Sequence, residues 1–193
     1  MKKGLYAIML CYLFLSANAN AAMPGQGYLG AAFHFGNYDE SGYSAVNPGG
    51  ASMRGGFYLN DFIAIEGRYA FGFFHDNVTL YDTGTSAYYK VKIKLKDMAS
   101  AFVKFDLPLS RSSNLYALLG FSRGTIEGSS GSVTESVTDS SYSYGFGGEF
   151  AIGNGLYFGG EYVMYLDERS NDYYGYYSGY YYSGINIGIT KYF

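Results

Sequence analysis

The feature that most constrains this chain is an alternation of period two that separates large apolar side chains from small and charged ones. In 62–74, one face carries Ile63, Ile65, Tyr69, Phe71 and Phe73, and the other carries Ala64, Glu66, Arg68, Ala70 and Gly72. Segments 142–153 and 156–167 repeat the pattern, and the second has an apolar face made of Phe158, Tyr162, Met164 and Leu166. Alternation of this kind predicts strands with two different faces, so we expect an all-β fold.

We expect eight such strands, at approximately 27–36, 50–59, 62–74, 90–107, 114–124, 142–153, 156–167 and 180–193. Short connections with turn residues alternate along the chain with longer polar ones, which lie at roughly 37–48, 75–89, 125–141 and 168–179. This alternation is typical of an antiparallel up-and-down barrel whose two ends face different compartments.

The direction of the apolar face decides between two kinds of barrel. A soluble barrel encloses its apolar side chains and exposes its charges. Here the charged face is rich in Gly and Ala, which suits a narrow interior, whereas the apolar face is too bulky to fit inside. An outward apolar band of that size needs lipid around it. The sequence therefore predicts an eight-stranded transmembrane β-barrel.

The N-terminal residues predict export. Lys2 and Lys3 precede an apolar run, and Ala19 to Ala21 fit a cleavage site, so we interpret 1–21 as a signal peptide and 22–193 as the barrel domain. Cys11, the one cysteine, falls in the signal peptide. Without Lys2 and Lys3, 11 basic residues face 16 acidic ones, a net charge of −5, which argues against nucleic acid as a partner.

Two stretches carry a family resemblance. GASMRGGFYLNDFIAIEGRYAFG resembles the second-to-third strand hairpin of small bacterial outer-membrane barrels of the OmpA/OmpX type, which include opacity-like surface proteins. YGFGGEFAIGNGLYFGGEYVMY is similar to the matching sixth-to-seventh strand hairpin. The resemblance implies location in the outer membrane, and it implies that Phe193 is the signal read by the outer-membrane assembly machinery. Lys191 departs from the family pattern, in which an aromatic or apolar residue is more usual.

Seven charged residues share the inward parity of the expected strands. They are Arg54, Glu66, Arg68, Lys104, Asp106, Glu149 and Glu161. The interior of an eight-stranded barrel is just wide enough for side chains to fill, and buried charges must pair, so we expect an ion-pair network that plugs the barrel. The alternative is a narrow pore for small solutes, in which these pairs rearrange to admit water.

Other residues point to the outer surface. Lys90, Lys92, Lys94 and Lys96 alternate with apolar residues, and they predict either a solvated strand face or a contact with lipopolysaccharide phosphates or an acidic host polymer. We expect the polar segment 125–141 to lack strong order. Tyr180, Tyr181 and Tyr182 are expected to form part of an interfacial aromatic girdle.

The sequence offers little for catalysis. His34 and His75 are the only histidines, neither belongs to a recognisable catalytic arrangement, and no cofactor or metal motif is present. We therefore expect a non-enzymatic outer-membrane barrel whose surface loops act in adhesion, resistance to host defence or envelope integrity. Partners would be membrane lipid, lipopolysaccharide and a host or surface ligand. A lipid A-modifying enzyme that uses His34 or His75 is a second alternative to the pore.

Overall fold

The computed structural model describes residues 24–193 apart from 42–43, 83–86, 111, 132, 169 and 172–176. The predicted signal peptide lies outside these residues, as does part of the tyrosine-rich segment before β11. Within the described ranges, no helix is long and apolar enough to cross a membrane.

The chain forms strands throughout. Their bounds are β1 Gly27–Glu40, β2 Gly49–Tyr58, β3 Ile63–Phe74, β4 Asp76–Asp82, β5 Ala87–Pro108, β6 Ser113–Ser130, β7 Val133–Gly153, β8 Leu156–Asp167, β9 Ser170–Asn171, β10 Tyr177–Ser178 and β11 Tyr180–Tyr192.

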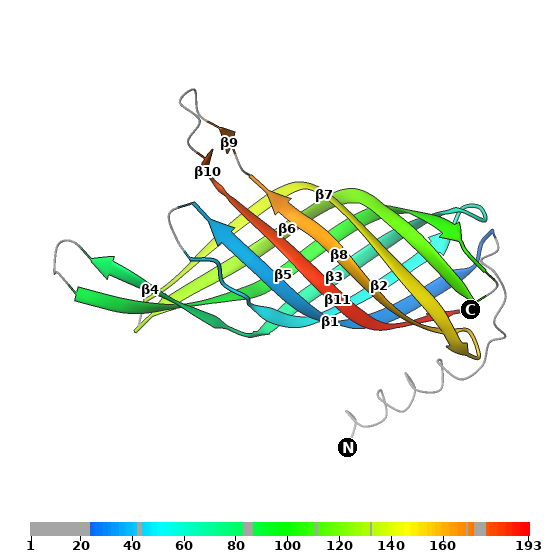
Figure 1. Ribbon diagram of the computed structural model, residues 1–193, viewed down its shortest axis with the longest axis horizontal. Helices are drawn as coiled ribbons and strands as arrows, with labels where there is room; N and C mark the ends of the chain where they lie inside the picture. Colours follow the sequence, from blue (N-terminus) through cyan, green and yellow to red (C-terminus); the bar gives the residue numbers. More distant parts are fainter. Residues whose placement is uncertain are drawn as a thin grey trace, which may run out of the picture.

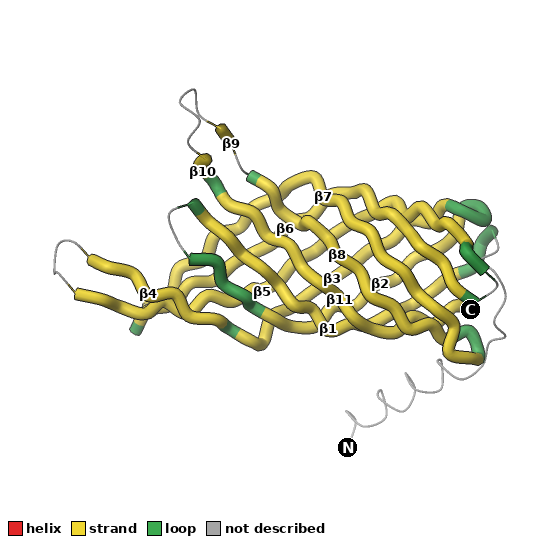
Figure 2. Tube along the Cα trace, viewed as in Figure 1, coloured by secondary structure: helices red, strands yellow, loops and turns green. Residues whose placement is uncertain are grey.

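The sheet closes on itself as an antiparallel barrel, which confirms the predicted fold class (Figures 1 and 2). Its order is β3-β2-β1-β11-β8-β7-β6-β5-β4, and β3 also pairs with β5 from Ile63↔Phe105 to Phe71↔Asp97. This last pairing closes the ring and leaves β4 outside it. The sheet therefore has nine strands in the described residues, one more than the expected number of segments, because 76–82 continues beyond β3 and extends its pairing with β5.

The two ends of the barrel differ in the length of their connections. The turns that join β2 to β3, β5 to β6 and β7 to β8 are short and lie at the end where the C-terminus lies (Figure 1). At the opposite end, β4, the start of β5 and the β6–β7 hairpin project beyond the ring (Figure 1). We call β4 with the adjoining parts of β5, β6 and β7 the projecting sheet.

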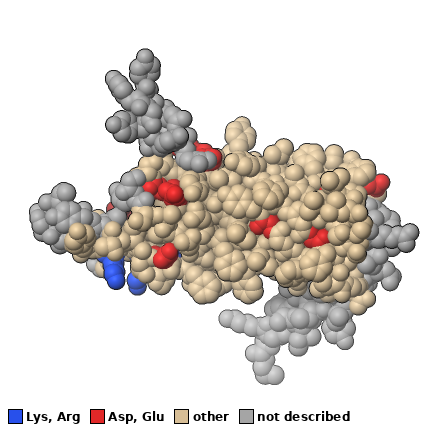
Figure 3. Space-filling view, in the orientation of Figure 1, with Lys and Arg blue, Asp and Glu red and all other residues tan. Residues whose placement is uncertain are grey.

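The barrel wall presents the apolar face outward, as the alternation predicted. Large apolar side chains such as Phe33, Phe71, Phe105, Phe146 and Ile187 are exposed. Figure 3 shows a wall with few charged side chains, while the visible Lys and Arg side chains gather at the projecting end. Such a surface matches the lipid-facing band of a membrane barrel.

The prediction that 125–141 lacks order is wrong. β6 and β7 stay paired through Thr125↔Thr138 to Ser130↔Val133, and the hydroxyls of Thr125 and Thr138 lie 3.0 Å apart. Six of the 17 residues of this segment are threonine, valine or isoleucine, and β-branched residues favour strands even where they bury little. Gly131 supplies the left-handed turn residue, with φ 59°.

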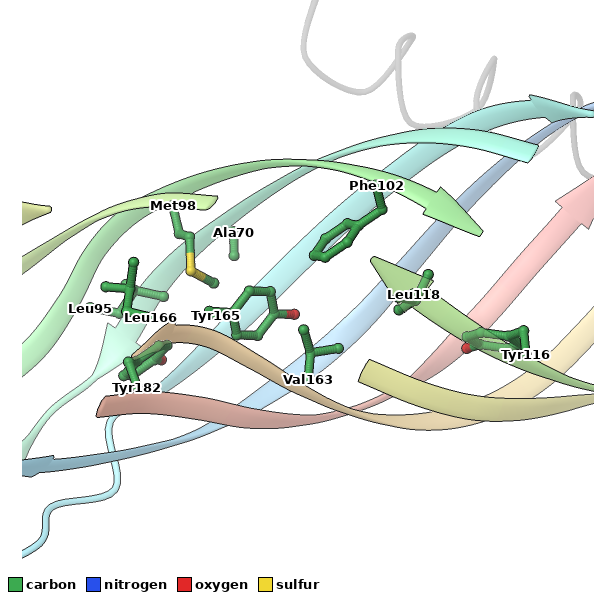
Figure 4. Close-up of a cluster of buried hydrophobic side chains, with 10 residues drawn as sticks. All are labelled: Ala70, Leu95, Met98, Phe102, Tyr116, Leu118, Val163, Tyr165, Leu166 and Tyr182. Atoms are coloured by element: carbon green, nitrogen blue, oxygen red, sulfur yellow. The ribbon is translucent and has the colours of Figure 1, made fainter. Parts of the chain in front are cut away.

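Two irregularities in strand pairing shift the faces of the strands. The registers of β5 with β6 and of β11 with β8 change between Leu95 and Asp97 and between Tyr182 and Ser183. An extra residue in one strand turns the following side chains to the other face. Leu166, predicted to face outward, therefore lies inside the barrel, in a cluster with Leu95, Met98 and Tyr182 (Figure 4).

Candidate functional site

The centre of the barrel interior is organised around Arg68. Its guanidinium forms ion pairs with Glu66, two residues earlier on β3, and with Glu161, which reaches it from β8. Nη2 of Arg68 also donates to Oε2 of Glu161 at 2.9 Å. Arg54, which faces Arg68 across the β2–β3 pair, donates from Nη1 to the same carboxylate oxygen at 3.1 Å. Glu161 therefore joins two guanidinium groups that would otherwise repel each other.

A second group surrounds Lys104, nearer the end that carries the short turns. Its ammonium lies 3.1 Å from Asp106 Oδ1 and 3.3 Å from Glu149 Oε1. It also donates to the hydroxyls of Tyr58 and Tyr192, each at 3.2 Å, and lies 4.4 and 5.3 Å from the ring centroids of Tyr116 and Tyr28. Ring faces attract a cation, and more strongly where water is excluded. Carboxylates and aromatic faces together thus hold a desolvated ammonium.

The structure brings all seven inward charges into one connected assembly. Arg54 joins the two groups, because its Nη2 lies 3.7 Å from Oε2 of Glu149. Six of the seven residues are buried, and Arg54 is nearly so. Apolar side chains fill the interior on the side of the projecting sheet (Figure 4). A hydrated ion that crossed this interior would have to separate several buried ion pairs and displace that apolar packing.

His34 belongs to the interior and is 1% exposed. Its Nδ1 lies 2.7 Å from Asn186 Oδ1, and its Nε2 lies 2.6 Å from the Tyr182 hydroxyl. Asn186 in turn donates to Glu161 at 3.0 Å. A histidine held in this way cannot reach a lipid in the surrounding membrane. His75 is exposed just before β4, and the described residues contain no group of three or more His, Cys, Asp or Glu placed to bind a metal.

The interior tyrosines were not among the residues singled out from the sequence. Tyr28 donates to Glu66 at 2.7 Å, Tyr58 to Asp106 at 2.6 Å and Tyr116 to Glu161 at 2.8 Å, so each contributes a hydroxyl to the network. A signal exists for two of them, since Tyr58 shares the parity of Arg54 on β2 and Tyr28 shares the inward parity of His34 on β1. Tyrosine is too often a lipid-facing girdle residue for that parity to have been noticed.

The four lysines of the alternating run lie on β5 within the projecting sheet. Lys90, Lys92 and Lys96 are exposed, while Leu95 between them is buried on the opposite face. Lys94 lies 2.8 Å from Glu127 on β6, and it is the only one of the four in an ion pair within the described part of the chain. We call these four side chains the lysine ladder; it continues the outer face of the barrel wall beyond the ring.

The three tyrosines expected in the girdle have different environments. The prediction is wrong for Tyr182, which is 0% exposed and lies inside the barrel, because it shares the inward parity of Gly184 and Asn186 on β11. Tyr180 donates to Asp139 at 2.5 Å and Tyr181 to Asp39 at 3.3 Å, both near the projecting end. Exposed rings on the outer wall near that end belong to Phe73, Phe74, Tyr142 and Tyr144.

The last strand ends at the opposite rim. Phe193 is 44% exposed, and its amide donates to the carbonyl of Gly27 at 3.0 Å. The ammonium of Lys191 donates to the carbonyl of Asn154 in the β7–β8 turn. Lys191 therefore caps a turn at this rim, which accounts for a charged residue beside the outward apolar positions of β11.

A closed antiparallel barrel with an apolar wall and a charged interior defines an integral outer-membrane barrel. The chain matches a family model described as "Outer membrane protein beta-barrel domain" over residues 7–193, and it belongs to this family. Family membership places the protein in the bacterial outer membrane. A search among curated protein sequences found no match.

Solved structures with this fold include small outer-membrane barrels of other bacteria. OprG from Pseudomonas aeruginosa is 11% identical with a TM-score of 0.62, covering 90% of this chain and 98% of that one. The attachment invasion locus protein Ail of Yersinia pestis is 18% identical with a TM-score of 0.58, covering 89% and 100%. Neisserial surface protein A is 12% identical with a TM-score of 0.58, covering 88% and 99%. One structure of Ail holds the heparin analogue sucrose octasulfate.

Proposed function

We propose that this protein is a non-enzymatic cell-surface interaction protein in which a closed barrel holds the projecting sheet outside the membrane. The lysine ladder carries the proposal, because it exposes Lys90, Lys92 and Lys96 along one strand, with Lys94 between them paired with Glu127. The ligand class is a polyanion: a sulfated or acidic polymer of a host surface, or the phosphates of lipopolysaccharide. Adhesion, resistance to host defence and envelope integrity are roles that such a contact serves.

The geometry of a strand explains why a polymer fits. Alternate residues of a strand lie about 7 Å apart on one face, so Lys90, Lys92 and Lys94 follow one another at that interval, and Lys96 follows them at the bulge. Clustered charges of one sign also raise the association rate of an oppositely charged ligand, and salt screens that effect. Ail, solved with a heparin analogue, is a precedent of similar fold for the same class of ligand.

The two alternatives have less support. A pore would need a water path, but the interior holds buried ion pairs, tyrosine rings and apolar packing. A lipid A-modifying enzyme would need an accessible histidine, and His34 is enclosed by Asn186 and Tyr182. His75 is exposed, but it belongs to no recognisable catalytic arrangement in the sequence.

The test is retention of the refolded protein on immobilised heparin at about 0.15 M salt. We expect the wild type to bind and to elute as salt rises, and a variant with Lys90, Lys92, Lys94 and Lys96 replaced by Gln to bind at least about 10-fold more weakly. The matched control replaces the same four residues with Arg, which keeps the charge. Equal retention of the Gln variant and the wild type would refute the proposal.

A parallel column of immobilised lipopolysaccharide separates the two sources of anionic groups. Loss on both columns identifies general polyanion binding, and loss on one alone identifies the ligand class. Heat-dependent migration in a detergent gel checks that each variant is folded.

Two further expectations concern biogenesis. Export should remove 1–21, so N-terminal sequencing of the mature protein should begin at residue 22. Phe193, which the family resemblance marks as the assembly signal, lies exposed at the end of β11. Phe193→Ser should lower the amount of folded barrel in the outer membrane without changing the folded state of the molecules that do assemble.

A further inference from the structure

We propose that a groove on the lipid-facing wall, close to the projecting end, binds one acyl chain of a lipid in the outer leaflet. The groove has a volume of about 540 Å³, within the range of small-molecule sites. Its main walls and floor come from Phe35, Gly49, Phe74, Tyr162, Ser183 and Ile185. We call it the outer groove.

Strand register explains where the outer groove lies. Paired residues place Tyr162, Ile185, Phe35, Gly49 and Phe74 in one row across β8, β11, β1, β2 and β3. Four of these five side chains are large, and Gly49 leaves a gap between the rings of Phe35 and Phe74. In the next row toward the projecting end, small Ser183 pairs with Asn37. The large side chains therefore form walls around a floor of small residues.

The interior packing requires part of that floor to be glycine. A Cβ at Gly36 would collide with the Tyr182 hydroxyl, and a Cβ at Gly184 would collide with the His34 ring. These inward contacts force both positions to lack a side chain. The barrel wall is consequently thin behind the outer groove, so the groove results from the way in which the interior histidine and tyrosine pack.

The rim of the outer groove is polar. The side-chain Nδ2 of Asn37 donates to Oδ1 of Asn47 at 3.3 Å, and the Tyr181 hydroxyl donates to Asp39 at 3.3 Å. The amide groups can bond the carbonyl or hydroxyl at the head of an acyl chain. The Asp76 carboxylate accepts from the backbone amide of Asn47 at 2.9 Å and so lies at this rim. Together with the Asp39 carboxylate it disfavours a phosphate there. The chain, and not an anionic headgroup, is therefore the part that the groove fits.

Location selects lipid as the occupant. The outer groove continues the exposed apolar band that includes Phe33, Ile187 and Ile189. In a member of this family that band is immersed in the membrane, so acyl chains are the molecules present at high concentration. A chain that enters from lipid gains packing contacts and little hydrophobic free energy, because the lipid is already apolar. We therefore expect a modest affinity that depends on shape.

The experiment is native mass spectrometry of purified protein that carries dimyristoyl phosphatidylglycerol as the probe lipid. We expect a wild-type population with one retained lipid, and at least a fivefold smaller lipid-bound fraction in Ser183→Leu, which fills the groove. Gly49→Ala is a milder second variant, because its Cβ would lie 3.2 Å from the carbonyl oxygen of His34 and 3.4 Å from the Phe74 ring. The matched control is Gly67→Leu on the same wall, where a Cβ meets nothing within 4 Å.

Each outcome decides between occupants. Displacement by methyl myristate but not by glycerophosphoglycerol supports an acyl-chain site, and the reverse overturns it. Equal retention by wild type, Ser183→Leu and Gly49→Ala, or an equal loss in Gly67→Leu, also overturns it. A change from dimer to monomer in Ser183→Leu would identify the outer groove as a contact between two copies, against the proposal.

Discussion

At the scale of single residues, the structure separates ion pairs that stabilise the fold from one that does not. Glu161 accepts from Arg54 and Arg68 in the interior. Glu161→Gln removes the charge but keeps the shape, and it leaves two guanidinium groups without that counter-charge. We expect a loss of about 3–5 kcal/mol in the free energy of unfolding, which urea titration of the protein in lipid vesicles would measure.

Glu127 provides the matched control. It pairs with Lys94 at 2.8 Å on the projecting sheet, where the lysine side chain is 42% exposed. Glu127→Gln should cost about 0–1 kcal/mol, because water solvates the lysine that is left. Similar costs for the two substitutions would mean that the interior is hydrated and that its ion pairs are screened.

Residue-level prediction from the sequence succeeded where chemistry and strand parity agree. An inward charge stands out among glycines and alanines, so Glu66 and Arg68 could be found without a structure. The partners of each charge could not be found, because Glu161 on β8 and Arg68 on β3 meet only through barrel closure. The tyrosine rings around Lys104 were missed for a different reason, since tyrosine suits either face of a membrane strand.

At the scale of elements, the position of a residue along a strand decides the effect of a charge. Ile187 lies in the middle of β11 and is 41% exposed, while Val137 on the projecting part of β7 is 63% exposed. Arg at Ile187 should destabilise the barrel by about 2–4 kcal/mol, because that side chain faces lipid near the midplane. Arg at Val137 should stay within about 0.5 kcal/mol, because water surrounds it. Refolding yield and urea titration in vesicles measure both, and equal losses would contradict the assigned lipid boundary.

The connection between β1 and β2 has a pH-dependent contact. The backbone amides of Asn47 and Asn77 donate to the Asp76 carboxylate and hold its pKa below the usual range. A lowered pKa means that the contact stabilises this connection above the ordinary pKa of about 3.9 and is lost as pH falls through the lower folded value. Hydrogen exchange at the Asn47 amide should therefore be slow near neutral pH and fast in Asp76→Ala.

The control for that measurement is the Val46 amide, which bonds the carbonyl of Tyr38 and does not involve Asp76. Its exchange rate should be the same in both proteins. Equal protection of the Asn47 amide in wild type and Asp76→Ala would show that the carboxylate does not hold this connection.

Strand existence followed from the alternation, whereas strand length and phase did not. The bulges near Lys96 and Tyr165 reverse the faces of the residues beyond them, so Leu166 lies on the side opposite to the predicted one. Tyr182 needs no bulge, because it shares the inward parity of Gly184 and Asn186. The sequence contains a sign of the bulge near Lys96, because the apolar residues stand at odd positions up to Leu95 and an apolar residue stands at the even position of Met98 after it. The order of 125–141 was missed because polar composition outweighed its β-branched residues.

At the scale of the whole molecule, the protein divides into a scaffold and a working surface. Closure of the sheet leaves no unpaired backbone edge in the membrane, which is why a barrel can cross it. The outward apolar face and the inward charges, both readable from the sequence, lead to this arrangement. The proposed contacts use local surfaces, the lysine ladder and the outer groove, because a fold of this kind does not by itself determine a ligand.

A conductance measurement tests most directly whether the barrel is closed, with its ligand contacts on the outside. Purified protein would be inserted into a planar lipid bilayer at high salt, with a wide porin as the control for insertion. We predict no defined conductance steps, because buried ion pairs, tyrosine rings and apolar packing fill the interior. Reproducible unitary steps from the wild-type protein would contradict a closed interior and would establish that the protein is a pore.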